Sequence, residues 1–445
     1  MTPAKMILLT FLGLILVGSF LLCLPISRTD GKWTPYIDAL FSSTSSVCVT
    51  GLMTIDIASE LSLFGEFVTL LLIQVGGLGF VTMTAFVFMI IGKKINYQTR
   101  MTLQEAFNKE ENAGVVKTVI HVLAITGVCE LLGFFALAPS MIEFSGNFWT
   151  GCFKALFLAV SAFCNAGIDP LGRGTADFSN LAFFQSNPFV LIPVMFLIVL
   201  GGIGFVVILD LVNRPKKNKK LSLHTKIVLW MTLILILFGA FVFMLAEWNN
   251  DATIGNLSIF DKIVNSFFQS ISTRTAGFST IDQSLMTDIS FMVSTFLMFI
   301  GGSPVSVAGG IKTTTFFVLL LFLTRNQDQN GNIIYRSKKI SQKVLSKALR
   351  ITLIAASLLL VGTALVFVFE GGDCSIDSVI YEVTSAICTV GLSFGITPSL
   401  CVMSKLTLVV LMYIGRIGML TIPLAFKTKE VNTSIEYIGA KIIVG

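Results

Sequence analysis

The sequence is poor in charged residues. Only 13% of its 445 residues are Asp, Glu, Lys or Arg, whereas 54% are hydrophobic. A soluble globular chain has about 25% charged residues. Apolar runs of roughly 18 residues or more recur along the chain, and runs of that length predict membrane-spanning helices. The shortage of charge therefore excludes a soluble protein and predicts an integral membrane protein.

Metal-ligand and nucleotide signatures are also scarce. The two histidines, His121 and His224, lack an accompanying carboxylate or second histidine, and the eight cysteines form no CxxC pair. Zinc sites need such clusters. No GxGxxG follows a strand and no Walker loop is present, so we expect this chain to bind no nucleotide itself. No nucleophile–base pair supports a membrane enzyme, and no nucleic-acid partner is expected.

One short motif occurs four times in variant form, ending at Gly51, Gly167, Gly277 and Gly391. An aromatic residue stands ten positions before each of these glycines. The residues between them are mostly small or hydroxylated and suffice for a helix of two to three turns. The aromatic residues are Phe41, Phe157, Phe267 and Tyr381. Four copies of one loop predict a ring around an axis.

A long apolar span precedes and follows each motif. The chain therefore reads as four helix–pore-loop–helix (M1-P-M2) units, which are parallel because each begins and ends on the same side of the membrane. We predict an all-α integral membrane protein with eight crossing helices and four half-spanning helices, arranged with pseudo-four-fold symmetry around one ion pore. The predicted units are 1–92, 93–213, 214–324 and 325–445.

Basic residues fix the orientation. The connectors 93–117, 213–226 and 324–350 hold more than half of the 31 Lys and Arg residues. By the positive-inside rule these connectors and both termini are cytoplasmic, so the pore loops enter from outside. The orientation of the chain in the membrane is by itself enough to explain the basic residues of the three connectors. Docking of a cytoplasmic partner or of anionic membrane lipid is a further interpretation.

The four loops are suited to coordinate a cation through backbone carbonyls. Glycine permits positive φ and close approach of the backbone, and each short helix directs its negative C-terminal end at the axis. A single such loop would more often be a helix-packing turn, but four equivalent copies favour a filter. No carboxylate stands within five residues before any of the four glycines, which disfavours a calcium-type filter. The predicted filter comprises Val49, Thr50, Gly51, Asn165, Ala166, Gly167, Thr275, Ala276, Gly277, Thr389, Val390 and Gly391.

Glycine clusters also recur in the second span of each unit, beginning at Gly76, Gly201, Gly301 and Gly415. Each cluster predicts a weak point in its helix, although close helix packing is the alternative interpretation of the first two. The third cluster holds four glycines and a proline in ten residues, which cannot form a continuous helix. We predict that it forms a flexible gate beneath the filter, made of Gly301, Gly302, Ser303, Pro304, Val305, Ser306, Val307, Ala308, Gly309 and Gly310.

Ionisable residues inside the spans are costly and suggest function. Arg416 stands in the fourth glycine cluster, where it could form an electrostatic barrier in the pore or pair with backbone carbonyls or an acid of a neighbouring helix. Lys312 follows the broken segment and is expected to anchor the gate. Arg274 is expected to brace its own pore loop, and Glu130 to make a polar contact between helices.

These motifs together resemble the superfamily of potassium transporters that includes the bacterial Trk and Ktr systems and the plant HKT proteins. The resemblance covers nearly the whole chain. It rests on the four filter glycines, the broken helix of the third unit and the arginine of the last. The first unit begins at the N-terminus with no additional leading spans, which is similar to the Ktr membrane subunit, KtrB, rather than to Trk. One departure is Asn165-Ala166, where the second filter loop lacks threonine.

The resemblance implies potassium uptake across a bacterial cell membrane, often dependent on sodium. It implies K+ as the transported ion, held by the carbonyls of the filter, and a homodimer of four-unit pores. It also implies a cytosolic regulatory ring of the RCK type (KtrA in Ktr systems) that binds ATP or ADP. The competing interpretation is a secondary transporter that holds another cation or solute at the membrane midplane, although such carriers typically show two halves rather than four.

Overall fold

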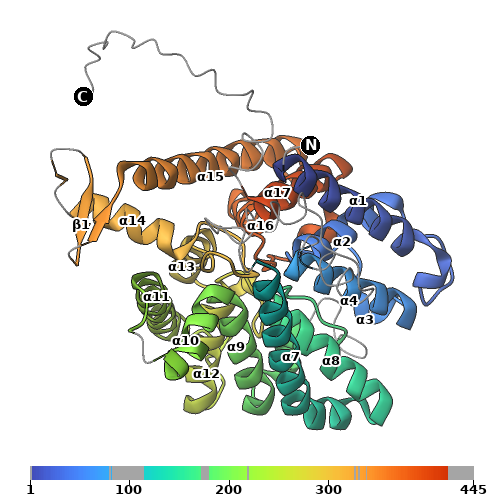
Figure 1. The fold of residues 1–445 in the computed structure, drawn as a ribbon. Helices are drawn as coiled ribbons and strands as arrows, with labels where there is room; N and C mark the ends of the chain where they lie inside the picture. The colour runs from blue at the N-terminus through green and yellow to red at the C-terminus, as the bar shows by residue number, and fades with distance from the viewer. Residues whose placement is uncertain are drawn as a thin grey trace.

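A computed structural model of the chain describes residues 3–79, 82, 115–171, 180–217, 220–324, 327–328, 331–336 and 338–418. Figure 1 shows the helices arranged around a centre in chain order, from blue through green and yellow to red. Most of the first predicted connector and the tail beyond residue 418 lie outside the described residues, as does part of the second connector.

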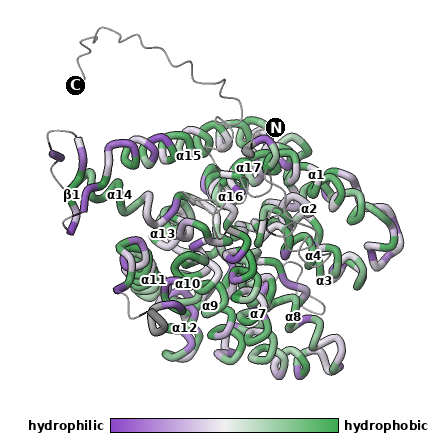
Figure 2. Tube along the Cα trace, viewed as in Figure 1, coloured by the Kyte–Doolittle hydropathy of each residue, from purple (hydrophilic) through white to green (hydrophobic). Residues whose placement is uncertain are grey.

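Four long helices are apolar enough to cross a membrane: α1 (Pro3–Cys23), α7 (Val115–Ser145), α11 (Leu223–Glu247) and α15 (Gln342–Phe369). Their outward surfaces are apolar, since Phe20, Leu132, Phe241 and Leu360 are each more than half exposed. Figure 2 shows hydrophobic residues along most of each helix and hydrophilic residues gathered mainly at helix ends and connections. Apolar faces of this extent indicate contact with lipid.

Four shorter helices lie inside this outer set: α2 (Tyr36–Cys48), α8 (Phe148–Cys164), α12 (Ile259–Ser272) and α16 (Ile376–Cys388). Side-chain caps fix the start of three of them, because Asn147, Ser258 and Ser375 accept hydrogen bonds from first-turn amides. With 13 to 17 residues, these helices are too short to cross a membrane. They correspond in position to the half-spanning helices expected from the sequence.

The second long segment of each predicted unit ends or bends at its glycine cluster. The four helices concerned are α4 (Leu63–Leu78), α9 (Pro188–Gly202), α13 (Asp288–Phe299) and α17 (Val402–Ile417). After α9 the chain bends by 95° into α10 (Phe205–Lys217), and after α13 a loop leads to α14 (Thr313–Thr324). Within the described residues, four single helices and this bent pair could each cross a membrane. The expected count of eight crossing helices stays a prediction, because the chain that follows Gly79 in the first unit and Gly418 in the fourth lies largely outside the described residues.

A small β-hairpin interrupts the helical pattern. Strands β1 (Ile333–Tyr335) and β2 (Lys338–Ile340) pair antiparallel, and Ile333 packs with Val318 and Leu345 in a separate apolar cluster. The expectation of an all-α chain is wrong in this detail, because two three-residue strands are too short to show a sequence period. The remaining elements are a short helix and four 3-10 turns: α3 (Ile57–Glu60), η1 (Pro25–Ser27), η2 (Asn180–Phe184), η3 (Gln283–Leu285) and η4 (Thr397–Ser399).

Contacts between the first and last helices close the arrangement. Lys405 Nζ in α17 lies 2.8 Å from Asp38 Oδ1 in α2, and the Tyr413 hydroxyl donates to the Leu8 carbonyl at 2.7 Å. The ion pair is largely buried, with side-chain exposures of 12% for Lys405 and 23% for Asp38. The chain thus returns to its starting point around the centre, where the short helices end.

Candidate functional site: a glycine ring and the loop beneath it

The glycine that follows each short helix packs against the next copy of the motif. A Cβ atom added to Gly51 would lie 2.6 Å from the Ala166 carbonyl oxygen, which is closer than any real Cβ contact. Each glycine faces the carbonyl before the next glycine in chain order, and the fourth faces back to the first. The other three contacts are Gly167 with Ala276, Gly277 with Val390, and Gly391 with Thr50. We call these eight residues the glycine ring.

Left-handed backbone turns the chain into the ring. The four ring glycines have φ between 64° and 103°. The residue two positions before each glycine is also left-handed, although none is glycine: Val49 (56°), Asn165 (58°), Thr275 (70°) and Thr389 (49°). Such a conformation is uncommon for β-branched residues, and local strain of this kind clusters at functional sites. Sequence reasoning expected positive φ at the glycines only, and among the four other residues only asparagine gives a signal for it.

Serine side chains hold the ring amides. Ser45 Oγ accepts from the Gly51 amide at 3.0 Å, and Ser385 Oγ accepts from the Gly391 amide at 2.9 Å. Ser161 accepts from the amide of Ile168, one residue beyond its glycine, at 3.2 Å. These serines stand six residues before the glycine in three copies, and this shared spacing is the sequence signal for their role.

The ring carbonyls remain free of protein donors. Among the described residues, none donates a hydrogen bond to the carbonyl oxygens of Thr50, Ala166, Ala276 or Val390, although all four residues are fully buried. The buried hydroxyls of Thr50, Thr275 and Thr389 also lack partners there. Buried polar atoms are nearly always paired, so such a group of unpaired acceptors indicates a ligand. Because the short helices end beside them, their carbonyl ends add negative potential that suits a cation.

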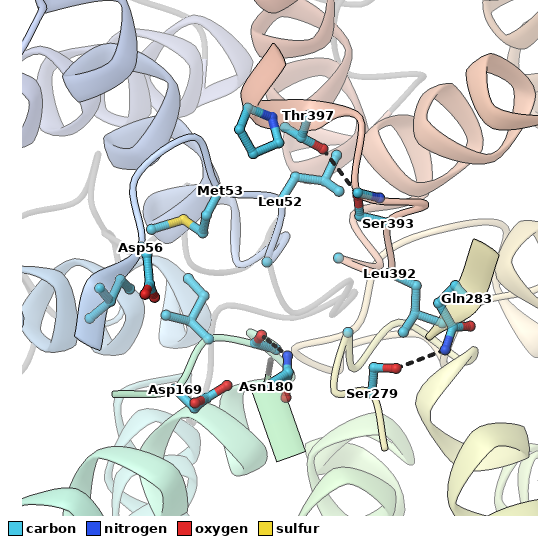
Figure 3. Close-up of a pocket in the computed structure, with 18 of the residues that line it drawn as sticks. Leu52, Met53, Asp56, Asp169, Asn180, Ser279, Gln283, Leu392, Ser393 and Thr397 are labelled. Carbon is cyan, nitrogen blue, oxygen red and sulfur yellow. Dashed lines mark hydrogen bonds between the residues drawn. The ribbon is translucent and has the colours of Figure 1, made fainter. Parts of the chain in front are cut away.

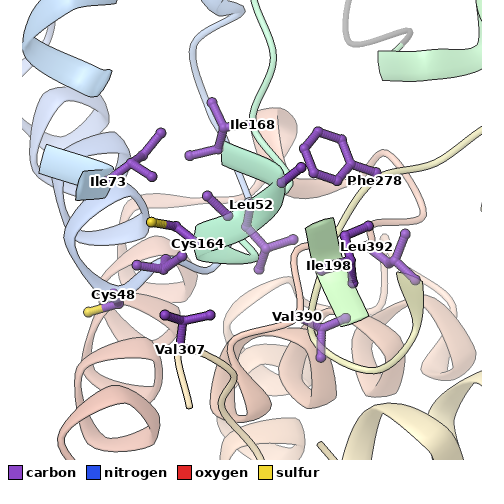
Figure 4. Close-up of a cluster of buried hydrophobic side chains, with 14 of the residues drawn as sticks. Cys48, Leu52, Ile73, Cys164, Ile168, Ile198, Phe278, Val307, Val390 and Leu392 are labelled. Carbon is purple, nitrogen blue, oxygen red and sulfur yellow. The ribbon is translucent and has the colours of Figure 1, made fainter. Parts of the chain in front are cut away.

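Apolar side chains anchor the ring on its outer side. The residue after each ring glycine is at most 2% exposed: Leu52, Ile168, Phe278 and Leu392. Figure 4 shows these side chains within the central hydrophobic cluster, with Val307 on the opposite side of the cluster from Ile168 and Phe278. Burying a side chain of this size stabilises by about 1.5–3 kcal/mol, so the four anchors fix the loops firmly.

A cavity of about 470 Å³ opens onto the ring and is lined by all four ring glycines. Figure 3 shows Asp56, Asp169, Ser393 and Thr397 around it. Asn180 Nδ2 donates to the Gly167 carbonyl at 3.3 Å at the cavity wall. Carboxylates in a vestibule raise the local concentration of cations.

The predicted gate segment lies on the other side of the ring. No helix is present from residue 300 to 312, and Val305 is left-handed with a φ of 57°. A Cβ on Gly309 would overlap the Cys388 carbonyl, and a Cβ on Gly301 would lie 3.0 Å from the Thr275 side chain. The segment therefore packs directly against two of the loops predicted to form the filter, and its glycines are needed for that close approach.

The break in the second unit holds the gate segment. The Ser303 amide donates to the Gly202 carbonyl at 2.9 Å, and the Phe205 amide donates to the Val305 carbonyl at 2.9 Å. The Gly202 carbonyl is available because α9 ends there, and the Phe205 amide is available because it begins α10 and has no partner within that helix. The sequence predicts a weak point or a packing site at the Gly201 cluster and gives no signal for this docking role.

Arg416 joins three parts of the molecule beneath the ring. Its guanidinium donates to the Gly76 carbonyl at 2.5 Å, to the Gly77 carbonyl at 2.9 Å and to the Val307 carbonyl. This arrangement corresponds to the carbonyl-paired alternative for Arg416, although the residue also lies beside the gate segment. Five donors in a planar fork suit arginine to such a role.

The other predicted ionisable residues also contact backbone or side-chain polar groups. Lys312 Nζ donates to the Ala308 carbonyl at 2.6 Å, within the gate segment. Arg274, which lies in the third pore loop, approaches the carbonyls of Thr232 in α11 and Gly301 at 3.5 Å, so its contacts connect that loop to neighbouring elements. A side chain as long as arginine reaches neighbouring elements, which the sequence does not specify.

Glu130 in α7 makes the polar contact between helices that the sequence predicts. Gln74 Nε2 in α4 donates to Glu130 Oε2 at 3.2 Å, and Cys164 Sγ lies 3.7 Å from Gln74 Oε1. This contact links the outer helix α7 to the end of α8 behind the ring.

Comparison with known proteins covers nearly the whole chain. Residues 11–436 match the family model described as "TrkH: Cation transport protein". The potassium/sodium uptake protein NtpJ of Enterococcus hirae is 36% identical over all of this chain and 98% of its own length. The Ktr system potassium uptake protein B of Bacillus subtilis is also 36% identical, over all of this chain and 97% of its own length.

A solved structure shares the fold. The potassium transporter TrkH from Vibrio parahaemolyticus superposes with a TM-score of 0.73, covering 95% of this chain and 84% of its own, at 16% sequence identity. The fold similarity therefore extends well beyond the range of close sequence similarity.

Proposed function

The chain belongs to the TrkH family of cation transport proteins, and from this membership we propose that it takes up potassium ions across a bacterial cell membrane. It is a multi-pass membrane transport protein and not an enzyme, since its relatives are named for ion uptake. We propose the orientation predicted by the basic connectors, with both termini in the cytoplasm and the vestibule outside.

The observation that carries the proposal is the group of unpaired carbonyls in the glycine ring. A dehydrated potassium ion needs several oxygen ligands in place of its water shell, and rings of backbone carbonyls supply them in potassium-selective pores. Val49, Asn165, Thr275 and Thr389 complete the twelve-residue filter, one at the left-handed position of each loop. The vestibule carboxylates Asp56 and Asp169 would gather cations above it.

The gate proposal rests on the segment 301–310, which packs beneath the filter. Arg416 and Lys312 both donate to carbonyls of this segment and hold it in place. In the closed state the segment narrows the path and Arg416 adds a positive charge beside it. Movement of the segment would require these hydrogen bonds to break, which makes it a two-state element that a regulatory partner could bias.

The proposal includes that potassium uptake by this chain depends on sodium. One relative is named for uptake of potassium and sodium, and the resemblance implies sodium dependence in many members. The alternative of a midplane-binding secondary transporter for another solute remains less favoured, because the unpaired acceptors are backbone carbonyls, which suit a bare cation.

Potassium uptake by the purified protein in lipid vesicles tests the proposal. With an inward gradient of the rubidium tracer, we expect the vesicles to take up rubidium. Added potassium should inhibit this uptake at concentrations at least about tenfold below those at which sodium inhibits it. The same vesicles with and without sodium test sodium dependence. Equal competition by potassium, sodium and a larger organic cation would contradict a potassium filter. Uptake of an uncharged solute would favour the secondary transporter instead.

The regulatory partner is proposed to be an RCK-type cytosolic ring that binds ATP or ADP and meets a homodimer of this chain. Its docking surface would comprise the connectors 213–226 and 324–350, which include the β-hairpin, and the tail 427–445. The described part of this surface carries four exposed lysines: Lys338, Lys339, Lys343 and Lys347. Anionic membrane lipid would meet the same charges at the membrane surface.

Neutralising Lys216, Lys217, Lys219 and Lys220 together is expected to weaken binding of the ring by about tenfold at low salt and less at high salt, because exposed charges are screened. Pull-down of the ring by the detergent-solubilised protein measures this effect. Replacing Lys32, in the connection before α2 that the proposed orientation places outside the cell, provides a control that should bind normally. Unchanged capture by the fourfold variant and by a variant lacking residues 427–445 would contradict the docking surface.

A further inference from the structure

Glu382 is a buried carboxylate within the short helix α16. Its residue exposure is 0%, and it lies in the half-spanning part of the chain. Three donors satisfy it: the Ser393 hydroxyl and the Phe394 amide (3.1 Å) on Oε1, and the Thr397 hydroxyl (3.0 Å) on Oε2. A carboxylate buried at this depth is costly unless its hydrogen bonds are complete.

All three donors belong to the segment that follows the ring glycine Gly391. Ser393 and Thr397 line the vestibule, where Figure 3 shows them side by side. Their hydroxyl oxygens are hydrogen-bonded at 3.3 Å. The segment contains Gly395, whose φ is 83°, and is not helical until η4 begins at Thr397. Glu382 therefore supplies hydrogen bonds that the segment's own backbone does not make.

Two side chains on one face of α16 accept hydrogen bonds from the fourth filter loop. Ser385 Oγ accepts from the Gly391 amide at 2.9 Å, and Glu382, one turn earlier on the same helix, accepts from the Phe394 amide. Residues three apart lie on the same face of a helix. The backbone from Gly391 to Phe394 is thus held at both ends by one helix, directly beside the Val390 carbonyl of the ring.

The carboxylate is peculiar to the fourth copy of the motif. The positions nine residues before the other three ring glycines hold Ser42, Leu158 and Phe268. A short helix of this type therefore forms without a carboxylate at that position, so the fold alone does not require Glu382.

We propose that Glu382 is a positioning residue that sets the ion selectivity of the filter by fixing the fourth filter loop. Its hydrogen bonds hold the segment 391–397 so that the Val390 carbonyl keeps its place in the glycine ring. The inference rests on the proposed function as a potassium transporter. Without the three hydrogen bonds the fourth loop relaxes, and the ring no longer favours potassium over sodium.

Glu382→Gln tests the inference with little change in shape. Glutamine presents one acceptor oxygen and a donating amide, so at least one of the three hydrogen bonds must be lost or reversed. We expect the ratio of potassium to sodium uptake in vesicles to fall about tenfold, equivalent to about 1.4 kcal/mol. Ser393→Ala and Thr397→Val, which remove single donors at the cavity wall, should each lower the ratio by a smaller factor.

Glu370→Gln is the matched control. Glu370 also accepts a backbone hydrogen bond, from the Cys401 amide at 3.0 Å, but it caps the outer end of α17 rather than a filter loop. This variant should keep the parent's selectivity. A merely structural role for Glu382 would reduce the uptake of both ions in proportion and leave their ratio unchanged.

The outcomes separate the two proposals. If the parent discriminates between the ions and the Glu382, Ser393 and Thr397 variants discriminate equally well, Glu382 has no positioning role and the proposed function stands. If the parent protein itself does not discriminate, both proposals are wrong. Should Glu382→Gln fail to reach the membrane, the two donor variants decide the matter, because each removes only one hydroxyl or its hydrogen bond.

Discussion

Replacing Arg416 by serine is expected to raise cation uptake by up to about a thousandfold in vesicles without a regulatory partner. A unit charge about 4 Å from the passing ion costs about 4 kcal/mol at an effective dielectric constant near 20. Each 1.4 kcal/mol corresponds to about tenfold in rate, so removal of that barrier accounts for the upper limit. Pairing with carbonyls offsets part of the charge, so the increase should lie below this limit.

The substitution also releases the gate segment. Arg416 is bound to Val307 in that segment and to Gly76 and Gly77 at the end of α4, and serine reaches none of these carbonyls. Deleting part of 303–309 should therefore raise uptake as well. Both variants should depend less on the regulatory ring than the parent does.

Rubidium uptake with and without the ring measures both effects. Arg28→Ser is a suitable control, because Arg28 is paired with Asp30 and Glu60 away from the gate segment and its loss should leave the rate unchanged. If the Arg416 and deletion variants reach the membrane and transport no faster than the parent, Arg416 and the loop are structural and gating lies elsewhere.

Replacing Gly391 by serine is expected to reduce the discrimination of potassium over sodium by at least about tenfold. The added Cβ would overlap the Thr50 carbonyl, and the φ of 98° disfavours any side chain. Relief of the overlap must move a ring carbonyl, and strain of this kind costs about 1–3 kcal/mol. Displaced carbonyls would coordinate a potassium ion less well than before, whereas they would coordinate a sodium ion no less well.

Gly372→Ser isolates the cause. Gly372 lies in the connection between α15 and α16, outside the loop that follows Gly391, and also has a positive φ (96°), but nothing lies within 4 Å of an added Cβ. This control carries the backbone strain without the overlap, and it should keep most of the selectivity. Competition of potassium and sodium for rubidium uptake measures both variants. Unchanged selectivity in serine variants of Gly51, Gly167, Gly277 and Gly391 would remove the filter assignment.

The sequence predicted the arrangement of the glycines at the centre of the molecule, because the motif that contains them occurs four times. Four glycines at matching positions predicted one ring, and the structure brings Gly51, Gly167, Gly277 and Gly391 into contact in chain order. The cluster of four glycines and a proline likewise predicted a non-helical segment, since no helix tolerates that composition. Both features depend on local backbone chemistry, which residue types specify.

Features that depend on distant backbone atoms could not be predicted. The acceptors of Arg416 and Arg274 are carbonyls in other parts of the chain, such as Gly76 in α4 and Gly301 in the gate segment, and a carbonyl has no residue-type signature. The sharp bend after Gly202 depends on the gate segment that packs into it, 100 residues further along the chain. The left-handed turn at Val49 and Thr389 contradicts the local preference of those residues, so tertiary packing must impose it.

Anomalous diffraction from crystals grown in rubidium tests the central claim most directly, because it locates the ion without reference to transport rates. We predict a peak within the glycine ring, about 3 Å from the carbonyl oxygens of Thr50, Ala166, Ala276 and Val390. The peak should weaken when potassium replaces rubidium and persist when sodium is added. Rubidium bound only at the vestibule carboxylates or elsewhere, with none in the ring, would contradict the assignment of these carbonyls as the potassium filter.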